Sequence, residues 1–165
     1  MPHTGTLEVT TPGECEIVMR RVFHAPRALV FKALTTPELL QRWLLGPDGW
    51  ELVVCRIDLR VGGTYRHVWR HADGRELAMG GSYREIVVPA RIVSTELFDQ
   101  DWTGGETLNT CVLDEAGGRT TLVNTVRYSS RQARDGALKS GMARGVTASY
   151  NRLQRVLDTL AGPTA

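Results

Sequence analysis

One apolar stripe near the C-terminus constrains the fold more than any other feature of this sequence. Apolar residues recur there every three or four positions: Leu138, Met142, Val146, Tyr150, Leu153, Leu157 and Leu160. This spacing predicts a single amphipathic helix of about six turns or more. We expect Ser130 to cap its start near Arg131, and Gly162-Pro163 to stop it.

Two glycines, Gly141 and Gly145, lie one turn apart inside this predicted helix. Each costs about 1 kcal/mol relative to alanine in a helix interior, so their presence needs a reason. One interpretation is a close approach of the helix to a sheet. The alternative is that the missing side chains leave room for a ligand.

Strands separated by short turns precede the helix. Strand-like runs cover residues 14–23, 50–60, 64–71, 76–88, 91–98, 106–115 and 119–128. Spacers such as Gly62-Gly63 and Ala72-Asp73-Gly74 favour hairpins and therefore antiparallel pairing. Two short helices are expected after the first strand, one opening at Pro26 and one from Glu38 to Trp43.

The order of these elements predicts an α+β helix-grip fold. In it, a curved six- to seven-stranded antiparallel sheet surrounds the long C-terminal helix, with two short helices after strand 1. Residues 1–13 are expected to form a flexible N-terminal tail, and residues 14–162 a single domain. A helix is only about 10 Å wide and cannot fill the concave side of such a sheet alone. Side chains, water or a ligand must occupy the remaining volume.

Composition excludes several classes of function. A net charge of +2 without a Lys/Arg block argues against nucleic-acid partners. The polar start does not resemble a signal peptide, and no apolar run approaches the ~20 residues of a membrane span, so we expect a cytoplasmic protein. Three widely spaced cysteines predict reduced thiols. His67 and His71 stand roughly 13 Å apart on one strand, so they cannot share a metal ion. We expect neither a metal nor a cofactor.

Several motifs resemble a known superfamily. They are Trp43, Gly46-Pro47, the run from Asp58 to Tyr65, Asp73-Gly74, the run from Gly81 to Arg91, and the run from Gly118 to Leu122. The sequence resembles the START-like superfamily, also called SRPBCC or Bet v 1-like helix-grip proteins. Within it, the chain is most similar to the branch homologous to the C-terminal domain of the activator of the Hsp 90 ATPase. The resemblance implies a hydrophobic cavity between sheet and long helix. It also implies varied uses, which include lipid or polyketide binding, polyketide cyclisation and co-chaperone action.

Candidate ligand-binding residues follow from strand and helix periodicity. Tyr65, His67 and Trp69 share one strand face and would line the cavity if that face is concave; ordinary core packing is the alternative. The complete candidate set is Trp43, Tyr65, His67, Trp69, Met79, Tyr83, Glu96, Phe98, Trp102, Met142, Val146 and Tyr150. Trp43 is expected to form a lid at the mouth. His67 could act as an acid–base group or ligand donor, and a His67–Glu96 contact is a hypothesis.

Three functions compete on this evidence. We favour a non-enzymatic binder of a hydrophobic or aromatic small molecule. The first alternative is a polyketide cyclase-like or related enzyme that uses His67 or Tyr83 as a proton donor. The second is co-chaperone-like stimulation of a chaperone ATPase. The eukaryotic co-chaperone has a separate N-terminal domain, and the thirteen residues before the domain here are too few to form one. This weakens the second alternative. A homodimer through an edge strand is possible.

Overall fold

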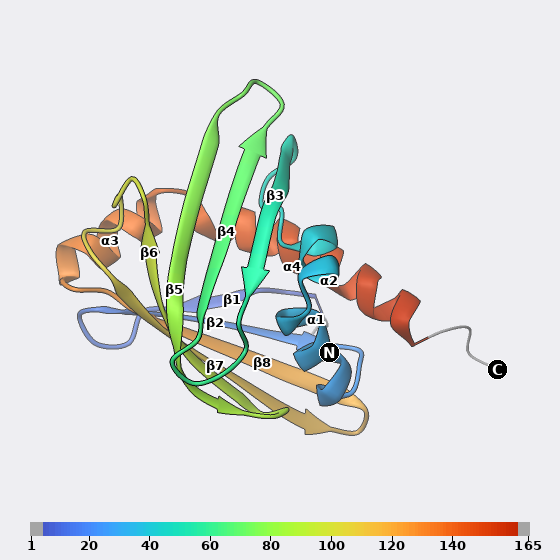
Figure 1. Ribbon diagram of the computed structural model, residues 1–165. Coiled ribbons are helices and arrows are strands. Elements are labelled where there is room, and N and C mark those ends of the chain that lie inside the picture. Colours follow the sequence, from blue (N-terminus) through green and yellow to red (C-terminus); the bar gives the residue numbers. More distant parts are fainter. Residues whose placement is uncertain (1–4, 162–165) are drawn as a thin grey trace.

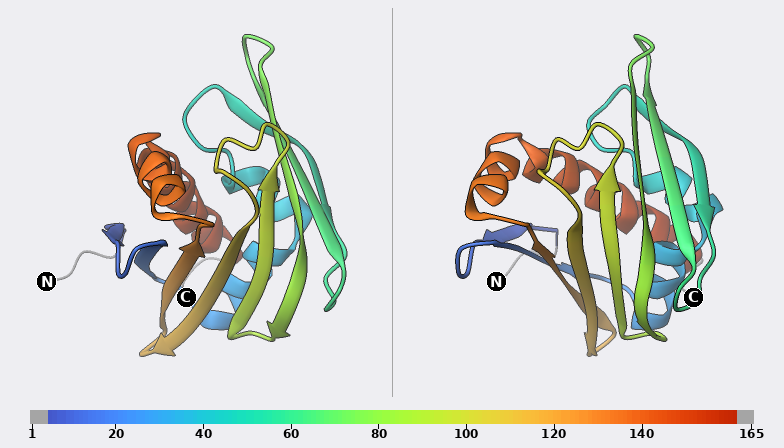
Figure 2. Two further views of the ribbon diagram at one scale, coloured as in Figure 1. Left: turned by 90° about the vertical axis from the view of Figure 1, so that its left-hand side faces the viewer. Right: turned by 60° about the vertical axis from the view of Figure 1, so that its left-hand side comes forward.

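An antiparallel sheet of eight strands curves around the C-terminal helices in the computed structural model, which describes residues 5–161 (Figure 1). The strand order is β1-β2-β8-β7-β6-β5-β4-β3. Figure 2 shows the C-terminal helices on the concave side of the sheet. The helix-grip prediction is confirmed. The predicted stop at Gly162-Pro163 and the first four residues of the predicted tail lie outside the described residues.

All seven predicted strands are present. Their bounds are β2 Glu16–Phe23, β3 Trp50–Ile57, β4 Thr64–His71, β5 Glu76–Val87, β6 Arg91–Phe98, β7 Thr107–Ala116 and β8 Arg119–Arg127. Residues 106–115 contain apolar residues on both strand faces, and burial shows which face of β7 points inward. Leu113 is buried and Cys111 half-buried on the inner face, whereas Leu108 is exposed. From β3 to β8, each strand pairs with the next one in the sequence through a hairpin, as the short spacers predicted.

The eighth strand, β1 (Glu8–Thr10), corrects the prediction of a flexible tail. It pairs antiparallel with β2, with Glu8 opposite Arg20 and Thr10 opposite Val18. The Glu8 carboxylate lies 3.5 Å from the Arg20 guanidinium. The three residues of β1 are all exposed, so the sequence has no apolar alternation there that would indicate a strand. The main-chain edge of β2 provides its pairing instead.

The two edge strands of the sheet are β1 and β3. On one side stands the three-residue β1; on the other stands β3, whose register shifts between Leu52 and Val54. Short edge strands and register irregularities both hinder the pairing of one sheet with another. A homodimer through an edge strand stays a prediction.

Helices α1 (Arg27–Thr35) and α2 (Pro37–Trp43) close one end of the sheet. Pro26 immediately precedes α1 and Pro37 is the first residue of α2, where a missing N–H costs no hydrogen bond. Both helices pack on the C-terminal helix in the main apolar core. That core includes the fully buried Phe23, Val30 and Leu153.

The predicted C-terminal helix is divided into α3 (Arg131–Lys139) and α4 (Met142–Leu160). Gly141 separates them with a φ of 82°, a left-handed conformation that glycine adopts without strain. Gly145 stays inside α4, but its neighbour is a loop rather than the sheet. A Cβ there would lie 3.6 Å from Pro47 Cδ and 4.0 Å from Gly46 Cα.

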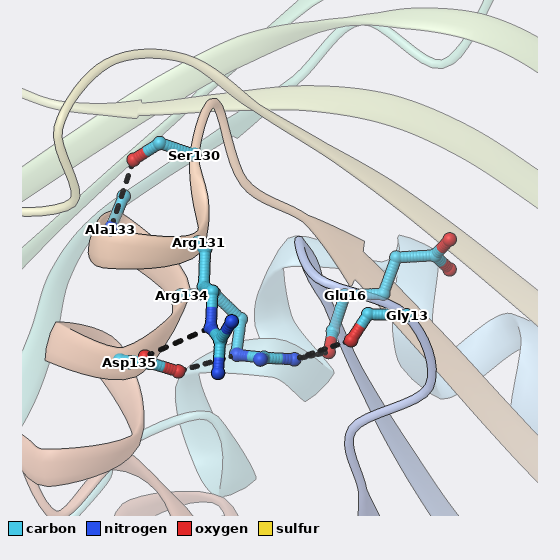
Figure 3. Close-up of polar contacts among 7 residues, drawn as sticks. All are labelled: Gly13, Glu16, Ser130, Arg131, Ala133, Arg134 and Asp135. Carbon is cyan, nitrogen blue, oxygen red and sulfur yellow. Dashed lines mark hydrogen bonds and ion pairs between the residues drawn. The ribbon is translucent and has the colours of Figure 1, made fainter.

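Arg134 attaches α3 to the segment that leads into β2 (Figure 3). Its buried guanidinium donates to the carbonyl oxygen of Glu16 at 3.1 Å and to that of Gly13 at 3.4 Å. It also donates to the Asp135 carboxylate at 2.8 Å. Ser130 caps the helix by accepting a hydrogen bond from the Ala133 N–H, as predicted for a helix starting near residue 131.

Replacing Arg134 with methionine is expected to destabilise the protein by about 2 kcal/mol, because the carbonyl oxygens of Gly13 and Glu16 lose a charged donor. Urea unfolding measures the change. Arg131→Met is the matched control: this exposed side chain lies 3.9 Å from the same carboxylate, that of Asp135, so its loss should cost less than about 0.5 kcal/mol. Equal losses in the two variants would contradict the role given to Arg134.

The described residues give no sign of a metal site or a membrane span. No group of three or more His, Cys, Asp or Glu residues within 5–161 could hold a metal ion. No helix in that range is long and apolar enough to cross a bilayer. The cysteines, Cys15, Cys55 and Cys111, are free thiols.

Candidate functional site

A cavity of about 570 Å³ lies between the concave face of the sheet and α4. Side chains from most strands, from α2 and from α4 form its wall, and the wall is mainly apolar. The structure places all twelve candidate residues on this wall: Trp43, Tyr65, His67, Trp69, Met79, Tyr83, Glu96, Phe98, Trp102, Met142, Val146 and Tyr150. That they bind a ligand stays a prediction.

Alternation along β4 directs three rings into the cavity. The ring centroids of Tyr65 and His67 are 5.2 Å apart, and those of His67 and Trp69 are 5.7 Å apart. Tyr83 of β5 adds a fourth ring, 5.5 Å from that of Tyr65. These spacings are typical of favourable aromatic pairs. The β4 face is therefore a continuous aromatic surface.

Two hydrogen bonds fix this surface in place. The Tyr65 hydroxyl donates to the carbonyl oxygen of Thr95 at 2.6 Å. The Trp69 indole N–H donates to the carbonyl oxygen of Leu44 at 2.8 Å. Burial raises the pKa of the Tyr65 hydroxyl well above its usual range, and the Glu96 charge raises it further. The Tyr65 phenol therefore stays protonated at physiological pH.

The predicted role of Trp43 as a lid is wrong. Trp43 is only 2% exposed and donates its indole N–H to the Ala33 carbonyl oxygen at 2.9 Å. Its ring packs against Tyr150 of α4, with centroids 6.1 Å apart. Trp43 thus belongs to the closed, core-facing part of the wall. Trp102, in the loop after β6, is 43% exposed and stacks on Phe98 with centroids 5.1 Å apart, which places it at the solvent-facing part.

His67 is buried in the aromatic surface, with 6% of its area exposed. Its Nδ1 atom has no hydrogen-bond partner among the described residues. Burial lowers the pKa of His67 from 6.5 to about 4, so the imidazole is neutral at physiological pH. The hypothesised His67–Glu96 contact is not formed: Met79 of β5 stands between β4 and β6 in the row of His67.

A polar strip crosses the opposite part of the inner face on β6, β7 and β8. Ser94 stands opposite Asn109, Glu96 opposite Thr107, and Cys111 opposite Asn124. The Asn109 side-chain amide donates to Glu96 Oε2 at 3.5 Å and to Thr107 Oγ1 at 3.4 Å. Burial raises the pKa of Glu96 from 4.5 to about 7.

Sequence reasoning found Glu96 but missed its polar neighbours. Asn109 and Asn124 line the cavity, although neither belongs to an apolar alternation. The available signal was register: a hairpin turn at Gly117-Gly118 places Asn124 opposite Cys111, on the same face. An inward Cys111 therefore implied an inward Asn124.

Burial keeps the thiol and tyrosine hydroxyl groups of this cavity protonated. Burial raises the pKa of the Cys111 thiol to about 12, so it carries little of the reactive thiolate. Burial also raises the pKa of the Tyr83 hydroxyl above its usual range. Neutral His67 and protonated Tyr83 can both donate or accept hydrogen bonds to a bound molecule.

Comparison with known proteins agrees with this architecture. The family described as Activator of Hsp90 ATPase homolog 1-like protein matches residues 24–158. The chain belongs to this family. Among solved structures of similar fold, a crystal structure from Rhodobacter sphaeroides is 32% identical, with a TM-score of 0.88. The match covers 93% of this chain and 99% of that one.

Two further structures share the fold of this chain. A protein from Nitrosomonas europaea is 22% identical with a TM-score of 0.81, and the match covers 93% of this chain and 100% of that one. One from Mycobacterium smegmatis is 21% identical with a TM-score of 0.82, and the match covers 94% and 99%. At these identities the likeness shows the fold alone. No curated protein matches the chain.

Proposed function

We propose that this protein binds a hydrophobic or aromatic small molecule in the cavity between the sheet and α4. The cavity itself is the observation that carries the proposal. Its volume of about 570 Å³ is in the range of small-molecule sites, and a mainly apolar wall with a few polar groups is their usual composition. Removing apolar ligand surface from water would drive binding.

Native and denaturing mass spectrometry of the purified protein tests the proposal directly. We expect a co-purified small molecule, or else saturable binding of the neutral fluorescent probe N-phenyl-1-naphthylamine. A protein that carries no ligand, and that neither binds this probe nor changes its melting temperature with any apolar aromatic compound, would refute the proposal.

Filling the cavity with a larger side chain should weaken probe binding. Val146 of α4 lies on the cavity wall and is only partly buried, so Val146→Trp would place an indole in the empty volume. We expect the affinity for the probe to fall by about tenfold or more while the circular dichroism spectrum is unchanged. Val87→Trp is the matched control, because Val87 is exposed and lies outside the wall. Weakening by both variants alike would contradict the location of the site.

The enzyme and co-chaperone alternatives stay predictions with their own tests. With its pKa lowered to about 4, His67 is uncharged at pH 7 and cannot donate a proton as an imidazolium. It keeps the roles of base and hydrogen-bonding group, so loss of turnover of an identified substrate in His67→Ala would favour an enzyme. Stimulation of a chaperone ATPase by the purified protein would favour the second alternative.

Binding in the cytoplasm fits the state of the cysteines. Cys15, Cys55 and Cys111 are all free, and thiols persist where the redox environment is reducing. Fractionation of cells that express the tagged protein tests this location.

A further inference from the structure

Glu96 is the one acidic side chain among the described residues that line the cavity. It lies on β6 between Ser94 and Phe98 on the inner face, and its side chain is half-buried in the cavity wall. Its recorded side-chain partner is the Asn109 amide at 3.5 Å, and no ion pair in residues 5–161 includes Glu96. A buried carboxylate without a cation is costly.

The rest of the wall makes this carboxylate electrostatically dominant. None of the described residues that line the cavity is a Lys or an Arg. His67, the other titratable nitrogen of the wall, is neutral at physiological pH. The charge of Glu96 also raises the pKa of Tyr65 and of Tyr128, after burial, so it acts on both sides of the cavity. An anionic ligand would meet repulsion there and no cationic partner.

We propose that the cavity selects apolar aromatic ligands that carry a protonated amine, with Glu96 as the counter-ion of that amine. This inference rests on the proposed small-molecule binding. The ammonium group would donate to the Glu96 carboxylate on the polar strip, beside Asn109. The apolar body of the ligand would lie against the rings of Tyr65, Trp69 and Phe98, which line the aromatic part of the wall.

Two physical effects favour the cation over a neutral analogue. A hydrogen bond between an ammonium group and a carboxylate is stronger than one between neutral groups, particularly away from water. Aromatic faces also attract a nearby cation, and several rings line this cavity. The ligand would supply the positive charge that the described wall lacks.

Three naphthalene compounds of nearly equal shape separate this inference from the proposed function. They are 2-naphthylmethylamine, 2-naphthylmethanol and 2-naphthoate, which are cationic, neutral and anionic. Calorimetric titration at about pH 8 keeps the amine largely protonated and Glu96 ionised. We expect the amine to bind about tenfold or more tightly than the alcohol, and the carboxylate to bind most weakly.

Glu96→Gln supplies the decisive variant, since it keeps the shape and removes the charge. It should reduce the preference for the amine over the alcohol to about twofold or less, and leave alcohol binding unchanged. Glu106→Gln is the control: Glu106 is exposed and lies outside the wall, so the preference should persist. Thermal unfolding checks that both variants are folded.

Each outcome bears on one of the two proposals. If the alcohol binds but the amine shows no advantage, or the advantage survives in Glu96→Gln, the amine inference is overturned and the proposed function stands. If none of the three compounds binds to the unaltered protein, the proposed function is itself contradicted.

Discussion

Replacing Gly81 with alanine is expected to destabilise the protein by about 3 kcal/mol, near the upper end for an overpacked interior. Gly81 lies on β5, where its Cα passes against the main chain of β6. An added methyl group would overlap with the carbonyl oxygen of Thr95, and it would come within 3.0 Å of the Tyr65 ring. That carbonyl oxygen also accepts a hydrogen bond from the Tyr65 hydroxyl of β4. β6 therefore cannot move away from β5 at this point without losing that hydrogen bond.

Gly136→Ala is the matched control for this substitution. Gly136 is an exposed residue of α3, and nothing lies within 4 Å of the position that its Cβ would occupy. Alanine is the better helix former by about 1 kcal/mol, so this variant should be stabilised. Urea unfolding of the two variants should give changes of opposite sign. A Gly81→Ala protein as stable as the unaltered one would show that β5 and β6 leave space for a methyl group between Gly81 and the Thr95 carbonyl oxygen.

The second large effect concerns the pH dependence of the free energy of unfolding, to which two groups of the cavity wall, His67 and Glu96, contribute in opposite directions. His67 has a folded pKa of about 4 and an ordinary value of 6.5, so the unfolded chain binds more protons between these values and His67 makes stability rise with pH. Glu96 has a folded pKa of about 7 and an ordinary value of 4.5, so the folded protein binds more protons in that window and Glu96 makes stability fall with pH. Each effect amounts to about 3 kcal/mol across its window.

Because the two windows overlap, the contributions of these groups nearly cancel in the unaltered protein. Single variants should separate them. Relative to the unaltered protein, His67→Phe should lose stability as pH rises from about 4 to 6.5, while Glu96→Gln should gain stability as pH rises from 4.5 to about 7. Free energies of unfolding from urea titrations at several pH values measure this. Curves for both variants that run parallel to that of the unaltered protein would contradict the burial assigned to these groups.

Much of the fold could be predicted because local patterns and tertiary structure agree in this chain. The alternation from Tyr65 to Trp69 identifies one face of β4, and short glycine turns fix the neighbouring registers. The stripe that includes Leu153 and Leu157 identifies the inner side of α4, and both residues are fully buried. These elements bury one apolar face each, so their periodicity is visible in the sequence.

Three features of the fold were missed or misread in the sequence. β1 has no apolar face, since only pairing with β2 makes it a strand. The apolar stripe continues from Leu138 to Met142 across Gly141, so periodicity could not reveal the break between α3 and α4. Trp43 was expected at the mouth of the cavity. The sequence could not exclude a core position, because a tryptophan at a helix end fits a lid and a core position equally well. Its hydrogen bond to Ala33 decides for the core.

The polar side of the cavity was the least predictable part. Hydrophobic patterning identifies residues that avoid water, whereas Asn109 and Asn124 face inward as polar groups. Their position depends on which face of β7 points inward, and the apolar residues on both faces of this strand left that undecided in the sequence. His67 and Glu96 both line the cavity. Whether they touch could not be predicted, because the distance between their strands depends on the register of β4, β5 and β6.

The pairing of β1 with β2 predicts how the protein would behave after proteolysis near its N-terminus. A chain that lost its first ten residues would expose the outer main-chain edge of β2 from Val18 to Arg20, with which β1 now pairs. It would also uncover Arg21, because Gly5 packs against the guanidinium of that residue. Unpaired strand edges recruit extended peptides or further copies of the same sheet. The nicked protein should therefore self-associate, even though its cavity and its helices would be intact.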